Sequence, residues 1–594
     1  MRIAALVKQI PQFETMTLGA DGRLAREGLP LELNAYCRRA VAKAVELTAI
    51  SGEVVVFTLG PPSADDALRE AIAWGDLHGS GRIRGVHLCD PAFAGSDTLA
   101  TARAIAAALT HEGGFDLVLC GRNSIDADTG QVGPQVAELL GVNFVGAARQ
   151  LTIDGAIAIA RVELDDGWMH VEATLPAVVA CAERLIEPSK VDPSGRANVA
   201  ASRIVRSSAQ ELGAGPWGVA ASPTSVGETR HVPVDRILHR RADLDLDRQI
   251  DLAFGVLRAN PIVPPPMSSR TLRRGGTRSG APIVVWCEPG RPAITAELLA
   301  AADRLGEITD GSVVALGPEA AATPALGACG ADHVVALVGD NIESAIARVS
   351  TRWITEHGAA IGLAPSTAWG REIAARVAAA IGAGLTGDAV DVDIDDGRLV
   401  AWKPAFGGSI VAAIRTSSPM QLVTVRPGVF GVPEPRPEFA THEQAQLAPV
   451  PGLHVHERER DDDLDDLASA RAIICVGRGV DPARYVDLEP LRSLLGAEFA
   501  ATRKVTDNGW MPRARQLGIT GRFVRPDLMV SIGAHGKYNH SVGYRNAGRV
   551  LAINRDPDAP VFATADVGIV GDWVDVVRRL VVRGVELQDS LAGR

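Results

Sequence analysis

Short apolar runs that predict strands alternate with Ala- and Leu-rich runs that predict helices along most of this chain. Residues 3–7 and 54–59 predict strands, and residues 35–48 between them predict a helix that Asn34 can cap. Strands that alternate with helices in this way favour a parallel, doubly wound sheet whose strands are buried on both faces. The pattern therefore predicts an α/β fold, with ligand sites beyond the carboxyl ends of the strands.

The alternation stops near residue 210 and resumes near residue 283. Strands predicted at 283–286 and 313–316 enclose a helix at 293–305, which repeats the order of the first block. A repeated order of elements indicates two related halves. A third α/β block runs from residue 473 to the end. We therefore expect two related doubly wound Rossmann-like domains, followed by a C-terminal α/β domain.

Two stretches interrupt this order. Residues 211–280 lack the alternation and include a Pro- and Gly-rich run at 261–276, and residues 431–466 are rich in Pro and acidic residues. Such compositions are typical of linkers, and 431–450 is a reasonable hinge. The domains predicted from these interruptions are 1–215, 216–281, 282–450 and 451–594.

Composition narrows the classes of function. A formal net charge of −11 argues against general nucleic-acid binding. No uncharged apolar run reaches the length of a membrane span, so we expect a cytoplasmic protein that does not insert into membranes. The seven cysteines are scattered singly, which indicates neither a disulfide framework nor a metal site.

Glycine-rich motifs interleaved with polar side chains fill the stretch from Arg503 to Asp572. Glycines let the backbone approach a ligand closely. A fixed cation, amide and hydroxyl groups and an imidazole can bind a flat anionic ligand such as a dinucleotide. Taken singly, Gly477-Arg478-Gly479 suits a plain turn, Arg503 a surface ion pair and His540 a polar core residue. Several such motifs in one order favour a cofactor site instead.

The loop at 121–134 is a second candidate site. It is rich in Asp, Thr and Gly, follows a predicted strand and precedes a predicted helix. A strand, a polar loop and a helix N-terminus form a geometry that binds anions. An ordinary connection with Asp and Thr capping explains the same residues equally well.

These motifs resemble those of the electron-transfer flavoproteins over almost the whole chain. Residues 1–210 are similar to the β subunit through the motif at 7–11 and the loop at 121–134. Residues 282–594 are similar to the α subunit through Trp402–Gly408, Arg426–Phe430 and the Arg503–Asp572 stretch. The resemblance implies that one polypeptide, an intramolecular β–α pseudo-heterodimer, replaces two subunits.

The resemblance implies one FAD in the C-terminal domain. Arg478 and Thr502 would lie near the pyrophosphate, Arg503 over the reactive edge of the isoalloxazine ring and His540 at its O2 atom. A permanent cation beside the ring favours its reduced forms. The cofactor contacts implied by the resemblance are Phe13, Arg478, Thr502, Arg503, Gln516, Leu517, Gly518, Ile519, Thr520, Gly521, His535, Gly536, Lys537, Tyr538, Asn539, His540, Asn554, Asp572 and Trp573.

The resemblance also implies a second nucleotide in the β-like half. Family members hold AMP here, but Val132 stands where an AMP-binding Thr is usual. The sequence of the loop is more similar to that of members that hold a second FAD and bifurcate electrons from NADH. Both AMP and FAD therefore remain candidates for the second nucleotide. The residues implied are Ser124, Asp126, Asp128, Thr129, Gly130, Gln131 and Val132.

Electron carriers of this family dock a flavin dehydrogenase as donor and a redox acceptor such as a quinone oxidoreductase. Pro193 occupies the place of a docking Leu, and Lys190 and Arg196 flank it. No residue pair suggests acid–base catalysis, so we expect an electron carrier rather than a substrate-converting enzyme. The alternatives are an NADH-oxidising, electron-bifurcating flavoprotein with two FADs and a nucleotide-binding regulatory or scaffold protein.

Overall fold

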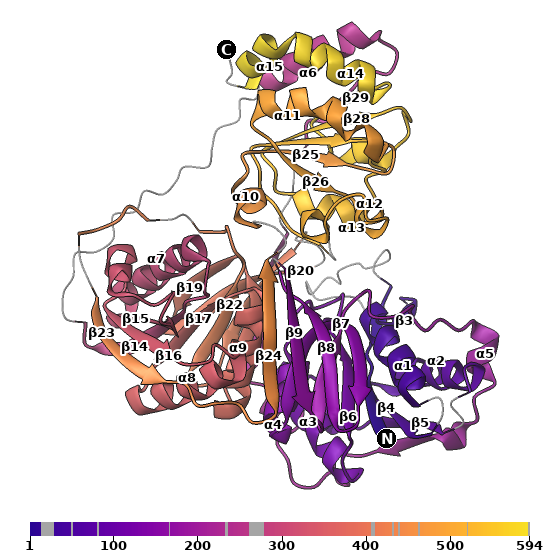
Figure 1. Ribbon diagram of the computed structural model, residues 1–594, viewed down its shortest axis with the longest axis vertical. Coiled ribbons are helices and arrows are strands. Elements are labelled where there is room, and N and C mark those ends of the chain that lie inside the picture. The colour runs from indigo at the N-terminus through magenta and orange to yellow at the C-terminus, as the bar shows by residue number, and fades with distance from the viewer. Residues whose placement is uncertain are drawn as a thin grey trace. The chain divides into compact units, whose positions relative to one another are not determined.

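The structure, a computed structural model, describes residues 1–12, 29–48, 51–79, 82–165, 167–231, 236–259, 278–405, 410–430, 433–437, 440–460, 464–518 and 521–591. It separates into two compact units (Figure 1). Unit one comprises Met1–Arg230, Ser269–Phe406 and Val411–Glu459. Unit two comprises His231–Ser268, Gly407–Ile410 and Arg460–Arg594.

The first half of unit one builds a ten-stranded sheet in the order β11-β5-β4-β1-β6-β10-β7-β8-β9-β24. Its strands are β1 (Arg2–Leu6), β4 (Glu53–Leu59), β5 (Ile83–Leu88), β6 (Leu117–Gly121), β7 (Asn143–Asp154), β8 (Ile157–Glu163), β9 (Gly167–Thr174), β10 (Ala177–Cys181), β11 (Ile204–Ser207) and β24 (Leu453–Arg460). The chain reverses its direction of winding at β1, which has β4 on one side and β6 on the other. Ligands bind doubly wound sheets at such a switch point.

Helices cover this sheet, so its parallel strands are buried. They are α1 (Ala35–Thr48), α2 (Asp65–Leu77), α3 (Thr98–His111), α4 (Val132–Leu140) and α5 (Pro193–Ala197). Local signals set their ends. The Asp97 side chain accepts a hydrogen bond from Ala100 N at the start of α3, and Gly141 ends α4 with a positive φ of 67°. A small separate sheet pairs β2 (Gln9–Pro11) with β3 (Leu31–Leu33).

The second half of unit one repeats the design with a seven-stranded parallel sheet, β18-β22-β17-β14-β15-β16-β23. The strands are β14 (Gly280–Trp286), β15 (Gly311–Pro318), β16 (His333–Val338), β17 (Ile361–Pro365), β18 (Gly384–Ala389), β22 (Gln421–Val425) and β23 (Thr441–Gln446); the helices are α7 (Pro292–Thr309), α8 (Glu343–His357) and α9 (Ala368–Ile381). Its switch point lies at β14, between β15 and β17.

The two halves of unit one exchange strands. β12 (Thr224–His231) follows the first half but joins β21 (Ile410–Thr416), β20 (Arg398–Ala405) and β19 (Asp391–Asp395) of the second. In return β24 lies beside β9 in the first sheet (Figure 1). Thr174 N donates to Gly452 O at 2.7 Å where that exchange begins. Backbone pairing therefore holds the halves together.

Unit two is a six-stranded parallel sheet, β13-β29-β28-β27-β25-β26. Its strands are β13 (His239–Arg240), β25 (Ala472–Val476), β26 (Glu498–Ala501), β27 (Leu528–Ile532), β28 (Arg549–Asn554) and β29 (Val567–Val570); its helices are α6 (Leu246–Ala259), α10 (Leu464–Ser469), α11 (Glu489–Leu495), α12 (Arg503–Asp507), α13 (Tyr538–Ser541), α14 (Trp573–Val582) and α15 (Gly584–Leu591). β25 is the switch point, between β26 and β27.

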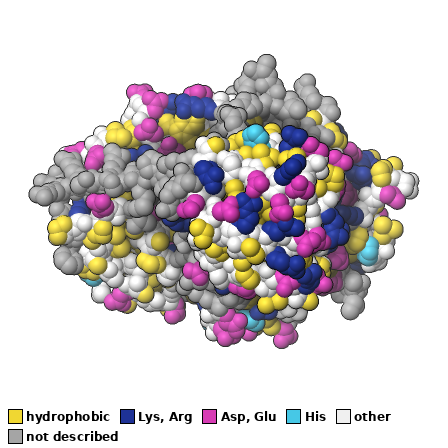
Figure 2. Space-filling model, turned by 90° about the horizontal axis from the view of Figure 1, so that it is seen from above, with side chains coloured by type: hydrophobic (Ala, Val, Ile, Leu, Met, Phe, Trp, Pro, Cys, Tyr) yellow, Lys and Arg dark blue, Asp and Glu magenta, His cyan; other side chains and the backbone are white. Residues whose placement is uncertain are grey.

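Residues 236–259 contribute to unit two, although the sequence lacks the α/β alternation there. β13 extends the sheet, and Arg236 forms a buried ion pair with Asp566 at 2.9 Å. Arg583, at the end of α14, pairs with Asp251 of α6 at 2.7 Å. Figure 2 shows basic and acidic side chains interspersed on the face that it views. The linker expected at 261–276 lies outside the described residues.

The expected α/β class, with parallel doubly wound sheets and a C-terminal α/β domain, is confirmed. Across the ranges given above, no helix combines the length and the apolar character that crossing a membrane requires.

Candidate cofactor and nucleotide sites

Two glycine-containing loops pack against each other at the switch point of unit two. Gly477 N donates to Ile532 O at 2.8 Å, and Gly479 N donates to Gly533 O at 3.0 Å. A Cβ atom on Gly477 would lie 2.3 Å from Gly533 O, so no larger residue fits there. Backbone hydrogen bonds and backbone packing thus hold the loops after β25 and β27 together, and we call a loop held in this way closed by backbone atoms. The neighbouring side chains are left available to a ligand.

The end of β28 supports the second of these loops. Asn554 Nδ2 donates to Ala534 O at 2.8 Å, while its Oδ1 accepts from Asp556 N at 3.0 Å. A Cβ atom on Gly536 would lie 2.2 Å from Val561 Cα. The resemblance implies that Asn554 holds the adenosine end of FAD; in the structure its side chain holds the loop on which His535 and Lys537 lie.

The described part of the 516–521 segment is anchored to β26 and α12. Leu517 N donates to Ala501 O at 3.0 Å, and the buried Gln516 side chain accepts a hydrogen bond from Thr506 at 2.7 Å. Gly518 has a positive φ of 123°, which favours glycine. A Cβ atom on Gly521 would lie 2.3 Å from Gln516 O. The predicted contacts Phe13, Ile519 and Thr520 lie outside the described residues.

Basic side chains gather beyond the carboxyl ends of β25, β26 and β27. Arg478, His535 and Lys537 are exposed, and the Arg503 side chain is 49% exposed with Asp507 at 3.2 Å. Thr502 immediately precedes α12 and donates its backbone N–H to Val476 O at 3.0 Å. These groups suit an anionic ligand such as a pyrophosphate. Tyr538 and Asn539 belong to α13, and their side chains are outside the described set.

His540 differs from these residues because its side chain is buried. Its Nδ1 lies 3.2 Å from Leu517 O, and its Nε2 lies 3.5 Å from Cys475 Sγ. Burial lowers the pKa of His540 to about 4, although the Leu517 carbonyl opposes the shift. The imidazole is therefore neutral near pH 7, with both ring nitrogens engaged by the protein.

The predicted adenosine-end residues lie after β29. Asp572 caps α14 by accepting a hydrogen bond from Val574 N at 2.9 Å, and its other oxygen lies 3.2 Å from Arg555. Trp573 is buried, with the Arg484 guanidinium 5.2 Å from its ring centre. Unit two thus places every described candidate contact beyond the carboxyl ends of its strands or in a loop packed there.

The loop after β6 lies at the switch point of the first half of unit one. Lys8, just after β1, contacts Asp126 at 2.7 Å and Ser124 at 3.3 Å. The fully buried Asn34 holds the loop backbone: its Nδ2 donates to Asn123 O at 2.8 Å, and its Oδ1 accepts from Ile125 N at 3.3 Å. Side chains therefore set the conformation of this loop.

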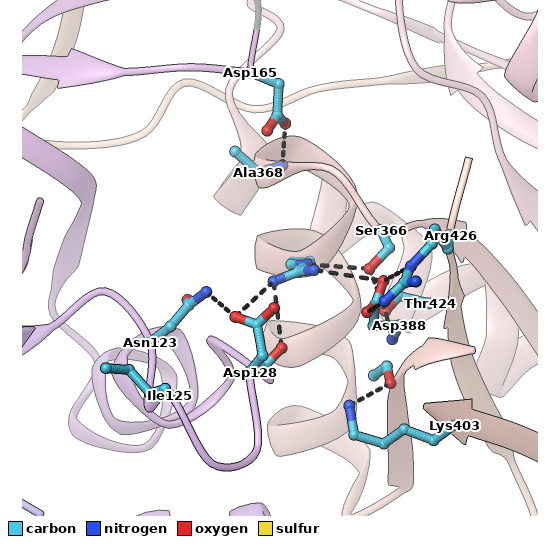
Figure 3. Close-up of polar contacts among 12 residues, drawn as sticks. Asn123, Ile125, Asp128, Asp165, Ser366, Ala368, Asp388, Lys403, Thr424 and Arg426 are labelled. Carbon is cyan, nitrogen blue, oxygen red and sulfur yellow. Dashed lines mark hydrogen bonds and ion pairs between the residues drawn. The ribbon is translucent and has the colours of Figure 1, made fainter. Parts of the chain in front are cut away.

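Asp128 faces the second half of unit one (Figure 3). Its backbone has a positive φ of 45°, and its carboxylate lies 4.0 Å from Arg371 of α9. Arg371 also lies 3.7 Å from Asp388, which pairs with Arg426. Burial acts to raise the pKa of Asp388, but the Arg426 charge outweighs it and holds that pKa at about 2.

Lys403 completes this cluster by donating to Gly387 O at 2.8 Å, and burial lowers its pKa. Lys403 and Arg426 lie in motifs that carry the family resemblance, so the sequence held a signal for them. No motif marks Arg371 or Asp388, because their partners are far away in the sequence.

The rest of the predicted nucleotide loop packs inside unit one. The buried Gln131 side chain donates to Leu385 O at 3.3 Å and accepts from Thr98 at 2.6 Å. Thr129 lies close to Gly387. Gly130 has a positive φ of 65°, and Val132 is the first residue of α4. The structure brings the seven predicted residues together on one loop, and Asp126, Asp128 and Gln131 have protein partners.

The three predicted docking residues lie at or beside α5. Lys190 and Pro193 are exposed, while Arg196 is half-buried and 3.5 Å from Glu70. Asp192 caps the short helix through Gly195 N at 2.9 Å. Over the residues that the structure describes, no cluster of His, Cys, Asp and Glu could hold a metal ion.

Comparison with known proteins identifies two kinds of domain. The electron transfer flavoprotein domain model matches residues 21–204 and 292–454, which is more than half of the chain. The electron transfer flavoprotein FAD-binding domain model matches residues 466–545. The first match falls on both halves of unit one, and the second covers β25 to α13 of unit two.

Curated relatives agree with these matches. Protein FixB of Salmonella typhimurium is 31% identical over 306 residues, which cover 50% of this chain and 96% of FixB. Protein FixB of Azorhizobium caulinodans is 34% identical over 286 residues, covering 45% of this chain and 78% of its own. A solved structure of Acinetobacter baumannii MurG matches with a TM-score of 0.20 and 12% identity over 52% of this chain and 93% of its own, too little to support any argument.

Proposed function

Because the chain belongs to the electron transfer flavoprotein family, we propose that it carries electrons on bound FAD from a flavin dehydrogenase to a downstream acceptor, such as a quinone oxidoreductase. The observation that carries this proposal is the FAD-binding domain match at 466–545, which spans the switch point of unit two. When bound, FAD supplies the electron-transfer chemistry, while the protein positions it and adjusts its potential.

The residues at that switch point fit a dinucleotide. Gly477 and Gly533 close the loops with backbone atoms, so a ligand can approach them without meeting a side chain. Arg478 and Lys537 are exposed beside these loops and would neutralise phosphate charge. Arg503, at the start of α12, would place a permanent cation near the ring and favour its reduced forms.

We also propose that the chain is a fusion of a β-like and an α-like half. The same domain model matches two separate stretches, 21–204 and 292–454. The exchange of β12 and β24 between the halves of unit one supports the proposal, since each half completes a sheet of the other. One chain would then do the work of two subunits.

For the loop after β6 we propose AMP as the resident nucleotide. Asp126, Asp128 and Gln131 already have protein partners, which favours a small ligand held by the loop backbone over a large one that needs these side chains. A second FAD, reduced by NADH in a bifurcating protein, is the competing occupant.

Extraction and quantification of the nucleotides in the purified protein tests these proposals together. We expect one FAD and one AMP per chain and a flavin absorbance spectrum. Two FADs per chain, with bleaching by NADH, would establish the bifurcating alternative. A sample that neither contains flavin nor takes it up would contradict electron carriage and leave the regulatory or scaffold function.

The surface around α5 is the proposed docking site for the electron donor. Lys190 and Pro193 are exposed there, and an exposed cation beside an apolar residue can meet an acidic partner. Charge reversal of Lys190 should slow electron transfer from the donor. Charge reversal of the exposed Arg352 on α8 is the control and should leave the rate unchanged. Equal rates in both variants would place docking elsewhere.

A further inference from the structure

His87 is a fully buried histidine near the carboxyl end of β5, in the first half of unit one. It pairs in register with Thr58 of the neighbouring strand β4. Its Nε2 atom lies 3.2 Å from Gly60 O, the carbonyl oxygen of the first residue after β4. The imidazole therefore contacts the backbone of the loop at 60–64 from within the core.

The contact with Gly60 determines which ring nitrogen carries the proton. A carbonyl oxygen only accepts hydrogen bonds, so Nε2 must donate to Gly60 O. Nδ1 has no hydrogen-bond partner among the described residues, and Asp65 Oδ1 lies 3.6 Å from it. Burial lowers the pKa of His87 and the charge of Arg206 adds to the shift, while the Gly60 carbonyl and Asp65 oppose it only in part. The ring is therefore neutral near pH 7, with its proton on Nε2.

The unpaired Nδ1 atom makes His87 a costly residue for this position. A buried polar atom without a partner costs free energy, which an apolar side chain of similar volume would avoid. What the imidazole provides instead is an N–H group at Gly60 O, which no apolar residue can supply. Because Gly60 N donates to Leu88 O at 3.2 Å, β5 holds both backbone polar groups of Gly60.

The loop at 60–64 borders the crevice at the switch point of this sheet. β1 lies between β4 and β6, so the loops that follow these three strands meet at one edge. Gln9 Nε2 donates to Ser63 O at 2.9 Å, and Thr58 Oγ1 donates to Val7 O at 3.1 Å, which ties the chain after β1 to the chain around the end of β4. The loop after β6, with the predicted nucleotide residues, lies on the other side of β1.

We propose that His87 is a positioning residue for the nucleotide site of unit one, which fixes the loop at 60–64 by donating its Nε2–H group to Gly60 O. This inference rests on the proposed binding of a nucleotide beside the loop after β6. With its carbonyl held by His87 and its N–H group held by Leu88 O, Gly60 presents one backbone conformation to the crevice. A loop that is already ordered costs less free energy to fix when a ligand binds. His87 acts through Gly60, since its own side chain is buried.

Calorimetric titration of the full-length, FAD-containing chain with AMP, after removal of bound AMP by dialysis, tests the proposal. His87→Gln keeps an N–H donor at the position of Nε2, whereas His87→Leu removes it. His87→Asn places its amide near the position of Nδ1, out of reach of Gly60 O, and serves if the Leu variant does not fold. Ser350→Ala is the matched control, because it removes another buried hydrogen bond of unit one, the one from Trp286 Nε1 at 3.0 Å.

We expect His87→Leu and His87→Asn to bind AMP about fivefold more weakly than the wild type, as loss of one hydrogen bond predicts. His87→Gln and Ser350→Ala should bind AMP as the wild type does. Hydrogen exchange at the Gly60 and Ala64 amides, which are hydrogen-bonded in this loop, should be about fivefold faster in the Leu and Asn variants, even without nucleotide.

Equal AMP affinity in the wild type and His87→Leu would overturn the proposal, as would a loss in His87→Gln as large as that in His87→Leu. If the wild type binds no AMP, the same titration is made with FAD, the competing occupant. A wild type that binds neither nucleotide would contradict the proposed function of the loop after β6. Hydrogen exchange then still decides the role of His87, because equal rates in all variants would mean that it does not fix the loop.

Discussion

The loop after β6 in unit one and the loops after β25 and β27 in unit two occupy equivalent places at switch points, but they are closed in different ways. In unit one side chains close the loop, through Asn34 and the pairs of Lys8 with Asp126 and Arg371 with Asp128. In unit two backbone atoms close the loops, with Gly477 packed on Gly533.

The difference teaches what each site can tolerate. Ion pairs with at least one partly exposed partner, such as Lys8 with Asp126 and Arg371 with Asp128, can be changed one side chain at a time at modest cost, because solvent replaces part of the missing contact. Backbone packing at a glycine tolerates no added atom. It also leaves Arg478 and Lys537 exposed for a ligand. Substitutions in unit two should therefore have larger effects than those in unit one.

The largest effect is expected for Gly477→Ala. The added Cβ would lie 2.3 Å from Gly533 O and 2.4 Å from Ala534 Cα, and neither atom can move without shifting β27. We expect loss of bound FAD and a fall of about 3 kcal/mol in the free energy of unfolding of unit two. Flavin content and denaturant unfolding measure the two effects.

Gly255→Ala in α6 is the matched control. A Cβ atom there meets nothing within 4 Å, so the change should leave FAD in place and stabilise the helix by up to about 1 kcal/mol. If Gly477→Ala retains its flavin and stability as well, backbone closure does not limit the site.

Acid should destabilise unit two through His540. The pKa of His540 is about 4 in the folded protein and near 6.5 when unfolded, so the unfolded state binds more protons between these values. Stability is then full above pH 6.5 and falls by about 3 kcal/mol as the pH drops to 4.

His540→Gln should remove this dependence, as unfolding curves at several pH values would show. In unit one, the pKa of Asp388 is about 2 in the folded protein and 3.8 when unfolded, so the stability that this carboxylate contributes is lost only below pH 3.8. If the wild type and the His540→Gln variant lose stability in parallel between pH 6.5 and pH 4, the imidazole is already charged in the folded protein over this range.

Asn34→Ala should have the largest effect among changes to the unit-one loop, about 2 kcal/mol of unfolding free energy. The side chain is fully buried, and its removal leaves Asn123 O and Ile125 N without partners. Denaturant unfolding measures the loss, and AMP titration should show weaker binding. Asn198→Ala, at an exposed position after α5, should change neither quantity.

Arg371→Gln should have the smallest effect, about 1 kcal/mol or less. Arg371 lies 4.0 Å from the Asp128 carboxylate and 3.7 Å from that of Asp388, and it donates to Asp128 O at 3.4 Å and to Ser366 Oγ at 3.1 Å. These contacts are long or weak and the side chain is 19% exposed, so water can replace part of what is lost. Unfolding free energy and AMP content measure the change, with Arg352→Gln on the exposed face of α8 as the control. A loss as large as that of Gly477→Ala would remove the contrast between the two sites.

The local pattern of the sequence determined the fold class. Strands such as β1 and β4 and helices such as α1 follow from runs of apolar and helix-forming residues, whose spacing is visible over short distances. The same pattern placed the candidate residues at the carboxyl ends of parallel strands, and motif order pointed to FAD. These inferences needed only neighbours in the sequence.

Tertiary structure alone decided how the sites are closed. The burial of His540 against Cys475, the approach of Arg371 to Asp128 and the exchange of β12 and β24 join residues with no local pattern in common. Their contacts arise because helices and strands from distant segments pack together. A side chain's polarity can be read from the sequence, but its burial and partners depend on what the folded chain places beside it.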